Sequence, residues 1–196
     1  MRLTLTAGVD EPPAVRLVSP DGDATTDPVP APSSATLIEG DNLWGLEALR
    51  AEGACVHLAY LDPPFFTQRK HRRTRRTRRG RGDIERSEHD AFDDRWPDLE
   101  TYLVTLRARL QRVRALLADD GCVVVHVDPT TSHYVKVVCD ELFGMRCFAS
   151  EIVWRYRRWP AKPPNFQRMH DVLLRYVKND RAKPRFQQLY EPLAPS

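Results

Sequence analysis

The chain has 196 residues, of which 41% are hydrophobic and 29% are charged, and its net charge is +3. That length and balance are typical of one soluble globular domain, and they exclude a membrane protein, because no apolar run approaches the roughly 20 residues that cross a bilayer. The N-terminus has no basic-then-apolar signal pattern, so we expect a cytoplasmic protein.

The cysteine and histidine patterns support neither a disulfide framework nor a metal site. The four cysteines, at positions 55, 122, 139 and 147, have no paired spacing and lie mostly in apolar segments. We therefore expect buried, reduced thiols. The six histidines include no HExxH pair, so no metal is predicted.

The N-terminal third predicts a leader followed by a strand, a helix and a second strand. Residues 1–34, rich in Pro, Asp, Ser and Thr, predict a disordered or loosely packed leader with at most one short strand at 14–18. Residues 35–53 predict a strand, a turn at Gly40 and a helix capped by Asp41 or Asn42. Residues 54–61, ACVHLAYL, predict a strand buried on both faces, as in a parallel sheet.

The rest of the chain continues the alternation of helices and strands. A long helix is predicted from Pro97, which suits a first helical position, to Leu117, where Asp119-Asp120-Gly121 ends its apolar stripe. Three strands are predicted at 122–128, 151–156 and 170–178, and a helix at 131–144 with Tyr134, Val138 and Leu142 on its apolar face.

Strands that alternate with helices predict an α/β domain with a largely parallel sheet. Ligands bind such sheets beyond the carboxyl ends of the strands. Asp41, Asp62 and Asp128 each follow a predicted strand and are therefore candidate site residues.

The segment HLAYLDPPFFTQRK ends a buried strand with Asp62-Pro63-Pro64-Phe65. Neither proline has an N–H, and both restrict the backbone, so the Asp62 carboxylate and nearby carbonyls are held as acceptors beside the Phe65 ring. This set suits a planar group with an amine, such as a nucleobase flipped out of a duplex, because acceptors on the amine stabilise the nitrogen that attacks a methyl group. A rigid turn without chemistry explains the same residues.

Several segments, in order, resemble the amino-methylating DNA methyltransferases of the beta group, including the modification subunits of type III restriction systems. They are GDNLWGLEAL (40–49), LAYLDPPFFT, AFDDRW, LADDGCVVVHVD, HYVKVVCDELFG, EIVWRY and HDVLLRYVKN, and the match covers about residues 36–180. The resemblance implies a Rossmann-like methyltransferase sheet with a C-terminal antiparallel hairpin.

The resemblance also implies roles for particular residues. Asp62, Pro63, Pro64 and Phe65 would form the catalytic loop around a flipped adenine, or less often cytosine. Asp41, Asn42 and Asp62 would hold S-adenosylmethionine, although Asp41 and Asn42 are also simple helix caps. This chemistry needs no strong base before attack, so we interpret His126, His133 and His170 as structural.

A basic run carries nine Lys or Arg and no acid between Arg69 and Arg81. We predict a disordered loop that contacts DNA phosphates. A solvated insertion and a coding bias towards arginine are the alternatives. The DNA-binding candidates are Phe66, Arg69, Lys70, Arg72, Arg73, Arg75 and Arg76.

The family's Phe-x-Gly-x-Gly cofactor loop does not occur; the one Gly-x-Gly, at Gly80–Gly82, lies in the basic run. We therefore expect an incomplete sheet: a leader (1–34), a partial catalytic domain (35–180, with a basic insertion at 69–82) and an irregular tail (181–196). The expected partners are DNA and either a missing C-terminal half or a restriction subunit. The alternatives are a non-catalytic nucleic-acid-binding remnant and an amine or amide methyltransferase acting on RNA or protein.

Overall fold

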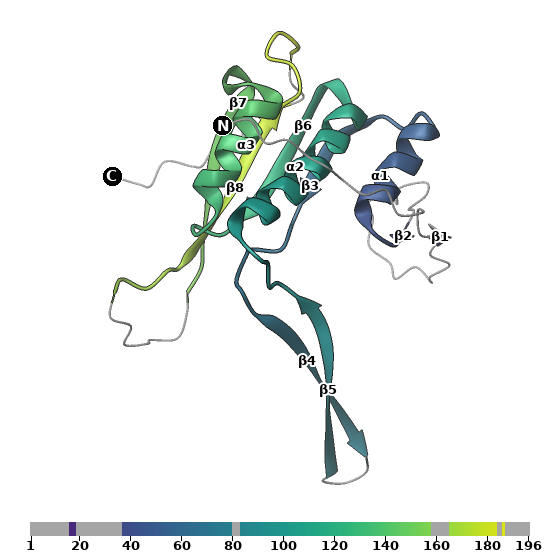
Figure 1. The fold of residues 1–196 in the computed structure, drawn as a ribbon, viewed down its shortest axis with the longest axis vertical. Helices are drawn as coiled ribbons and strands as arrows, with labels where there is room; N and C mark the ends of the chain where they lie inside the picture. The colour runs from purple at the N-terminus through teal and green to yellow at the C-terminus, as the bar shows by residue number, and fades with distance from the viewer. Residues whose placement is uncertain (1–15, 19–36, 80–82, 158–164, 184–185, 187–196) are drawn as a thin grey trace, which may run out of the picture.

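The body of the molecule is a four-stranded sheet with helices packed on one face (Figure 1). The computed structural model describes residues 16–18, 37–79, 83–157, 165–183 and 186, and for residues 16–18, 73–79 and 83–90 it describes the backbone alone. The elements, in chain order, are β1 Arg16–Val18, β2 Leu37–Glu39, α1 Asn42–Ala51, β3 Val56–Leu61, β4 Lys70–Arg79, β5 Asp83–Asp93, α2 Leu99–Leu116, β6 Leu117–Val127, α3 Ser132–Phe143, the 3-10 turn η1 Met145–Cys147, β7 Phe148–Arg155 and β8 His170–Val177.

The central sheet has the strand order β3-β6-β8-β7. Strands β3 and β6 run parallel, joined by a crossover that contains α2, as parallel strands require. Strand β8 lies antiparallel to β6 and forms an antiparallel hairpin with β7. The predicted α/β class and the predicted C-terminal hairpin are confirmed.

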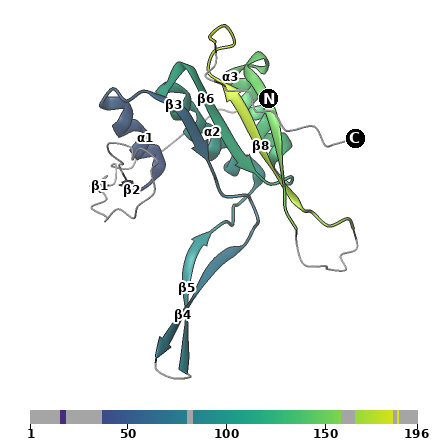
Figure 2. The same cartoon turned by 180° about the vertical axis from the view of Figure 1, so that it is seen from behind.

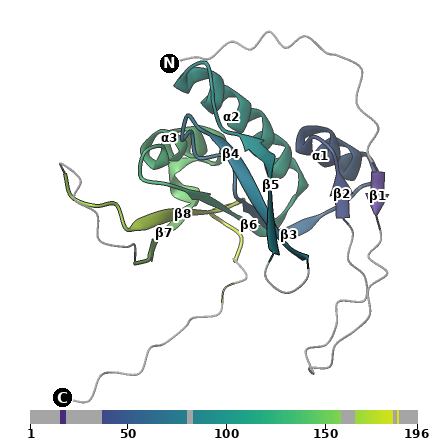
Figure 3. The ribbon, with the colours of Figure 1, turned by 90° about the horizontal axis from the view of Figure 1, so that it is seen from below.

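Helices cover one face of this sheet, and in the described residues no helix lies on the other face (Figures 2 and 3). From Gly121 to Val127 every second residue of β6 is buried, and Val123, Val125 and Val127 pack against α2 and α3, whereas the residues between them are only partly buried. The prediction that residues 54–61 are buried on both faces is wrong, because Leu58 and Tyr60 are 62% and 56% exposed. We call the sheet face that carries Leu58 and Tyr60, which no helix of the described residues covers, the open face.

Helix α2 begins at Leu99, two residues later than predicted. Pro97 lies before the helix, and Asp98 is the N-cap, accepting a hydrogen bond from the Thr101 amide at 2.6 Å. A side-chain acceptor at this position satisfies an amide that the helix leaves unpaired, so capping by Asp98 decides the boundary.

The C-terminal end of α2 also differs from the prediction. The helix ends at Leu116, Leu117 starts β6, and Asp119-Asp120-Gly121 lies inside that strand. Leu117 pairs with Val56 of β3, so the segment that begins at Leu117 joins the sheet as a strand. A Cβ on Gly121 would lie 3.0 Å from the Ala118 carbonyl oxygen and 3.1 Å from that of Val56, so the glycine permits close backbone approach.

Helix α3 has nearly the predicted extent, and of its predicted apolar face Val138 is buried and Leu142 partly buried against the core, whereas Tyr134 was assigned wrongly. Gly144 ends it with φ +93°, the left-handed region that glycine favours. Tyr134 is 51% exposed, and the residues that face the core are Val135, Val138, Cys139 and Phe143. Cys139 and Cys147 are buried as expected, whereas Cys55 is exposed.

The strand before α1 lies outside the central sheet. Strand β2 pairs antiparallel with β1, which confirms the short strand expected near 14–18, and the rest of the predicted leader lies outside the described residues. Helix α1 packs beside α2 at the β3 edge (Figure 3). Asp41 therefore follows a strand of the small sheet, and not a strand of the central one.

The basic run forms a β-strand, so the prediction of a disordered loop is wrong. Strands β4 and β5 pair over their whole length as an antiparallel hairpin that projects away from the sheet (Figure 1). The register sets acids of β5 opposite basic positions of β4, as at Arg72–Asp90 and Arg79–Asp83. Cross-strand pairs of opposite charge stabilise such a ribbon, and the sequence pattern of β4 alone did not reveal them.

No helix within the described ranges combines the length and the apolarity that a bilayer crossing demands.

Candidate functional site

The candidate site is built around the loop of residues 62–69, called here the DPPF loop, which joins β3 to the hairpin. Its backbone includes two non-glycine residues in the left-handed region, Phe66 at φ 59° and Gln68 at φ 57°. Such conformations cost of order 1–3 kcal/mol each and persist only where the surroundings impose them.

Asp94 imposes this conformation. Its side chain is 1% exposed, and its Oδ1 accepts from the Phe66 amide (3.1 Å) and the Trp96 indole (3.0 Å). Its Oδ2 accepts from the Thr67 amide (2.7 Å) and hydroxyl (2.6 Å). A buried carboxylate is tolerated when its lone pairs are filled in this way.

The same contacts join the DPPF loop to the base of the hairpin. The Gln68 side chain donates to the Trp96 carbonyl (3.0 Å) and accepts from the Trp96 amide (2.9 Å). His71 Nε2 lies 3.1 Å from the Thr67 hydroxyl, and its ring stacks on Phe92 at 4.4 Å between centroids. Loop and hairpin base therefore form one hydrogen-bonded unit.

A cavity of about 540 Å³ opens beside the DPPF loop, lined on one side by Asp62, Pro63, Pro64 and Phe65 and on the other by His71 and Phe92. The Asp62 side chain is 63% exposed, so its carboxylate is available to a ligand. The Asp94 carboxylate also lines this cavity, but its oxygens already accept the hydrogen bonds described above, so Asp62 supplies the available carboxylate. An available carboxylate among apolar and aromatic walls is what a planar amine-bearing ring requires.

A second cavity, of about 570 Å³, shares Pro63, Pro64 and Phe92 with the first and extends to Asp41 and Asn42. The structure thus brings both of these predicted cofactor residues to the prolines of the DPPF loop, although β2 is not in the central sheet.

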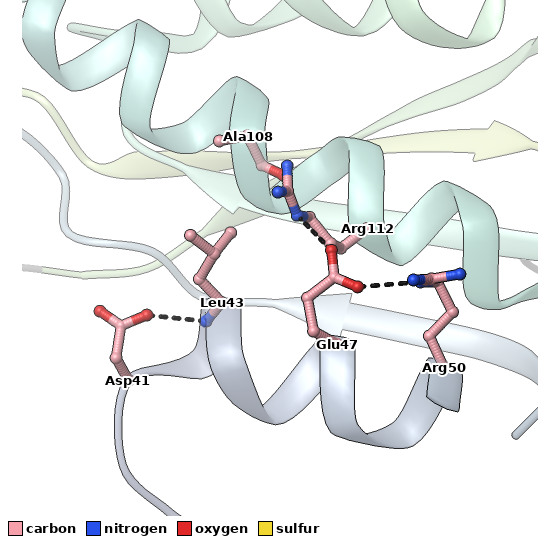
Figure 4. Close-up of polar contacts among 6 residues, drawn as sticks. All are labelled: Asp41, Leu43, Glu47, Arg50, Ala108 and Arg112. Atoms are coloured by element: carbon pink, nitrogen blue, oxygen red, sulfur yellow. Dashed lines mark hydrogen bonds and ion pairs between the residues drawn. The ribbon is translucent and has the colours of Figure 1, made fainter. Parts of the chain in front are cut away.

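Asp41 caps α1, as predicted, by accepting from the Leu43 amide at 2.8 Å (Figure 4). Its other oxygen lies 3.0 Å from Arg109 of α2, whose Nε donates to the Asn42 side chain at 2.6 Å. One turn further, Glu47 bridges Arg50 and Arg112 at 2.8 and 2.9 Å, which ties α1 to α2 (Figure 4). The hydrogen bond from Arg50 lowers the pKa of Glu47.

His126 of β6 lies behind the DPPF loop on the open face. Its Nδ1 is 3.1 Å from the Tyr60 hydroxyl and 3.5 Å from Asp62 Oδ1. Its Nε2 is 3.4 Å from Asp171 Oδ2, and Phe65 meets its ring edge-on at 5.3 Å.

A third cavity, of about 550 Å³, lies on the other side of Phe65 and is markedly more polar. Arg69 and Arg168 line it together with Asp128 and Asp171. Asp128 accepts from the Thr130 amide and hydroxyl, both at 2.9 Å, so this predicted strand-end carboxylate holds its own turn.

The predicted DNA-binding residues lie in different surroundings. Arg69, Lys70 and Arg72 are exposed, whereas the side chains of Arg73, Arg75 and Arg76 lie outside the described part of the structure. Phe66 packs its ring against Tyr102 at 5.6 Å and anchors the loop in the core. Its contact with DNA stays a prediction.

Sequence reasoning missed Asp94, Gln68, Trp96 and Asp171. A signal for Asp94 and Trp96 exists in AFDDRW, where acids stand between two aromatic residues just before a capped helix, but this segment does not contain Gln68. Asp171 had none, because a carboxylate at the start of a strand has no pattern of its own.

A sequence profile of the DNA methylase family, which covers N6 and N4 methylation, matches residues 56–193. The chain therefore belongs to this DNA methylase family. It is 33% identical to the type II methyltransferase M.EcaI of Enterobacter cloacae over 146 residues, or 73% of this chain. It is 26% identical to the Mod subunit of the type III restriction-modification enzyme EcoP15I of Escherichia coli over 159 residues, or 75% of this chain.

The chain spans only part of these relatives, 29% of M.EcaI and 24% of the EcoP15I Mod subunit. Among solved structures, that of the M1.HpyAVI–SAM complex overlaps 79% of this chain and 62% of its own, with a TM-score of 0.45 and 15% identity.

Proposed function

We propose that this chain carries the catalytic part of a DNA methyltransferase that transfers a methyl group from S-adenosylmethionine to the exocyclic amine of adenine, or less often cytosine. The observation that carries the proposal is the exposed Asp62 carboxylate beside Phe65, at a cavity of about 540 Å³, in a chain of the DNA methylase family. An Asp62 side chain buried in the core, with no cavity beside Phe65, would have contradicted the proposal.

The first cavity would take the flipped base. Asp62 would accept from the amine N–H and so keep electron density on its nitrogen, and Phe65 would stack on the ring, a contact that offsets part of the unstacking cost. The two prolines and Asp94 prevent the loop from relaxing, so the acceptors are in place before the base arrives.

The second cavity fits S-adenosylmethionine. Its polar end is Asp41 and Asn42 and its walls include Phe92 and Trp96, which suits a molecule with a planar base and a charged end. When bound, the cofactor supplies an electrophilic methyl group. Asp41, Asn42 and Asp62 would hold it, and the shared prolines would separate it from the base.

The hairpin would bind DNA. Residues 70–93 carry nine Lys or Arg against five Asp or Glu, so the ribbon remains basic despite its acidic second strand. A two-stranded ribbon fits a major groove, and arginines neutralise phosphates without reading sequence. This observation also favours the second candidate function, a nucleic-acid-binding remnant without activity.

A methyl-transfer assay tests the proposal. Unmethylated phage DNA, RNA and a protein lysate are each incubated with the chain and labelled S-adenosylmethionine, and digested DNA is analysed for N6-methyladenine and N4-methylcytosine. We expect label in DNA adenine, lost on Asp62→Ala with the circular dichroism spectrum unchanged.

Other outcomes redirect the assignment. Label in RNA or protein would support those acceptors instead. DNA binding without S-adenosylmethionine binding by calorimetry, alone or with a C-terminal Mod-like segment added, would support the remnant. A restriction subunit as partner and a cytoplasmic location are proposed on the same family grounds.

A further inference from the structure

We infer that His126 is a positioning residue for the proposed reaction, the group that takes from Asp62 the proton released by the methylated amine. The inference rests on the proposed function. It differs from the sequence interpretation, in which His126 is a structural histidine.

The geometry gives His126 one carboxylate on each side. Nδ1 lies 3.5 Å from Asp62 Oδ1, and Nε2 lies 3.4 Å from Asp171 Oδ2. The two carboxylates differ in access, since the Asp62 side chain is 63% exposed while those of His126 and Asp171 are 19% and 17% exposed. The chain Asp62–His126–Asp171 therefore leads from the substrate cavity to the third, polar cavity, which Asp171 lines.

We place the proton of neutral His126 on Nε2. This nitrogen is buried, makes no hydrogen bond within the described part of the chain and lies 3.4 Å from Asp171 Oδ2, an acceptor. The lone pair is then on Nδ1, which lies 3.1 Å from the Tyr60 hydroxyl. Tyr156 donates to the other oxygen of Asp171 at 3.1 Å and keeps it an acceptor.

This tautomer leaves a basic nitrogen beside Asp62. Once the amine nitrogen has formed its bond to carbon it carries a positive charge, and one N–H bond breaks as its proton moves to Asp62 Oδ1. The proton then moves to Nδ1, so Asp62 is again a carboxylate and His126 an imidazolium. Asp171 balances that charge through Nε2–H, and solvent takes the proton after the product leaves.

The ionisable groups around the ring are consistent with this role. Strand β3 and the DPPF loop contribute Tyr60 and Asp62, and β8 contributes Asp171; no cation of the described residues makes an ion pair with His126. Carboxylates therefore lie on both sides of the ring. A histidine that only fills space needs neither.

The first test reads the tautomer and requires no activity. Nitrogen-15 NMR of the histidine rings in the full chain, with the His126 signal assigned by its loss in His126→Asn, should show a protonated Nε2 and a bare Nδ1 at neutral pH. In Asp171→Asn the preference for Nε2–H should weaken. A protonated Nδ1 in the wild type, or no response to Asp171→Asn, would overturn the inference.

The second test separates a proton acceptor from a space-filling ring. His126→Ala should lower kcat for DNA methylation about 100-fold, the low end for a positioned proton acceptor, with KM for DNA unchanged. Added imidazole should restore activity, whereas pyrazole, of the same shape but far less basic, should not. Rescue by both azoles would assign His126 a space-filling role.

His57→Ala is the matched control, because His57 lies on β3, is exposed and faces Asp120 at 3.7 Å, away from the loop. Its kcat should equal that of the wild type. If the wild type transfers no methyl to DNA while the tautomer is as expected, the proposed function fails and the His126 contact stands. If the wild type is active and His126→Ala is equally active, the function stands and the inference fails.

Discussion

At the scale of single residues, the site depends on acceptors that the fold holds in place. Asp62 offers an exposed carboxylate, while the buried Asp94 supplies the hydrogen bonds that keep the next residues in the left-handed region. The two acids stand at the opposite ends of the hairpin in sequence. The DPPF tetrapeptide predicts the first acid, and only the tertiary structure explains the second.

Asp94→Ala should destabilise the protein by about 2–3 kcal/mol, because four donors in part-buried hydrogen bonds lose their acceptor. Urea unfolding followed by tryptophan fluorescence measures the change. The exposed neighbour Asp93→Ala is the control and should shift the midpoint far less. Equal shifts in both variants would show that the loop does not depend on Asp94.

The pair of Asp93 and Arg95 gives a pH prediction. The hydrogen bond from Arg95, 2.5 Å from Asp93 Oδ2, lowers the pKa of Asp93 to about 2. A pKa depressed by folding contributes stability above the unfolded-state value, and this contribution is lost as the pH falls towards 2. The wild type should therefore exceed Asp93→Asn in urea midpoint at pH 6, and the difference should vanish near pH 2. A constant difference across this range would contradict the assignment.

At the scale of elements, periodicity and turn chemistry predict most of the central body. Helices α1 and α3, the β7–β8 hairpin and the cap at Asp41 follow from local patterns. Three of the misses share one cause, since each depends on a partner distant in sequence. The start of β6 at Leu117 depends on Val56, the exposure of Tyr60 depends on which face the helices cover, and the basic strand β4 depends on β5.

Gly121 allows a direct test of this long-range pairing. In Gly121→Ala the new Cβ would lie 3.0 to 3.2 Å from three carbonyl oxygens, of Ala118, Val56 and His57, and backbone atoms cannot rotate away. We expect a loss of about 1–3 kcal/mol in the free energy of unfolding. Gly45→Ala is the control, because its Cβ meets only the Ile38 side-chain methyl at 3.3 Å and alanine favours a helix. A neutral Gly121→Ala would mean that β3 and β6 are not packed this closely.

At the scale of the whole molecule, the site lies where three parts meet: the carboxyl ends of β3 and β6, the α1–α2 pair and the base of the hairpin (Figure 1). The hairpin extends from the residues that fix the DPPF loop, so a DNA duplex bound along it would approach the cavity beside Asp62. The order of the motifs predicts the family. It does not predict this coupling, because the hairpin was interpreted as a loop without structure.

The register of the hairpin predicts which arginines contribute most to DNA binding. Arg75 and Arg76 stand opposite Ser87 and Arg86, so the backbone register sets no acid directly across from them, whereas Arg72 and Arg79 stand opposite Asp90 and Asp83. We expect an arginine with no acid directly opposite to displace more ions from phosphates than one that faces an acid. Each phosphate neutralised on duplex DNA contributes about 0.9 to the slope of log affinity against log salt.

The matched pair of double variants therefore gives different slopes. Arg75→Ala with Arg76→Ala should reduce the salt slope by about 2 for a random 30-base-pair duplex, measured by fluorescence anisotropy between 50 and 200 mM salt. Arg72→Ala with Arg79→Ala removes the same formal charge. It also leaves Asp90 and Asp83 without an arginine opposite, and these two acids then repel the phosphates. The repulsion lowers the affinity but changes the number of released ions little. Its slope should fall by less than half as much. Equal slopes for the two pairs would mean that net charge alone, and not the pairing of β4 with β5, governs how this protein holds DNA.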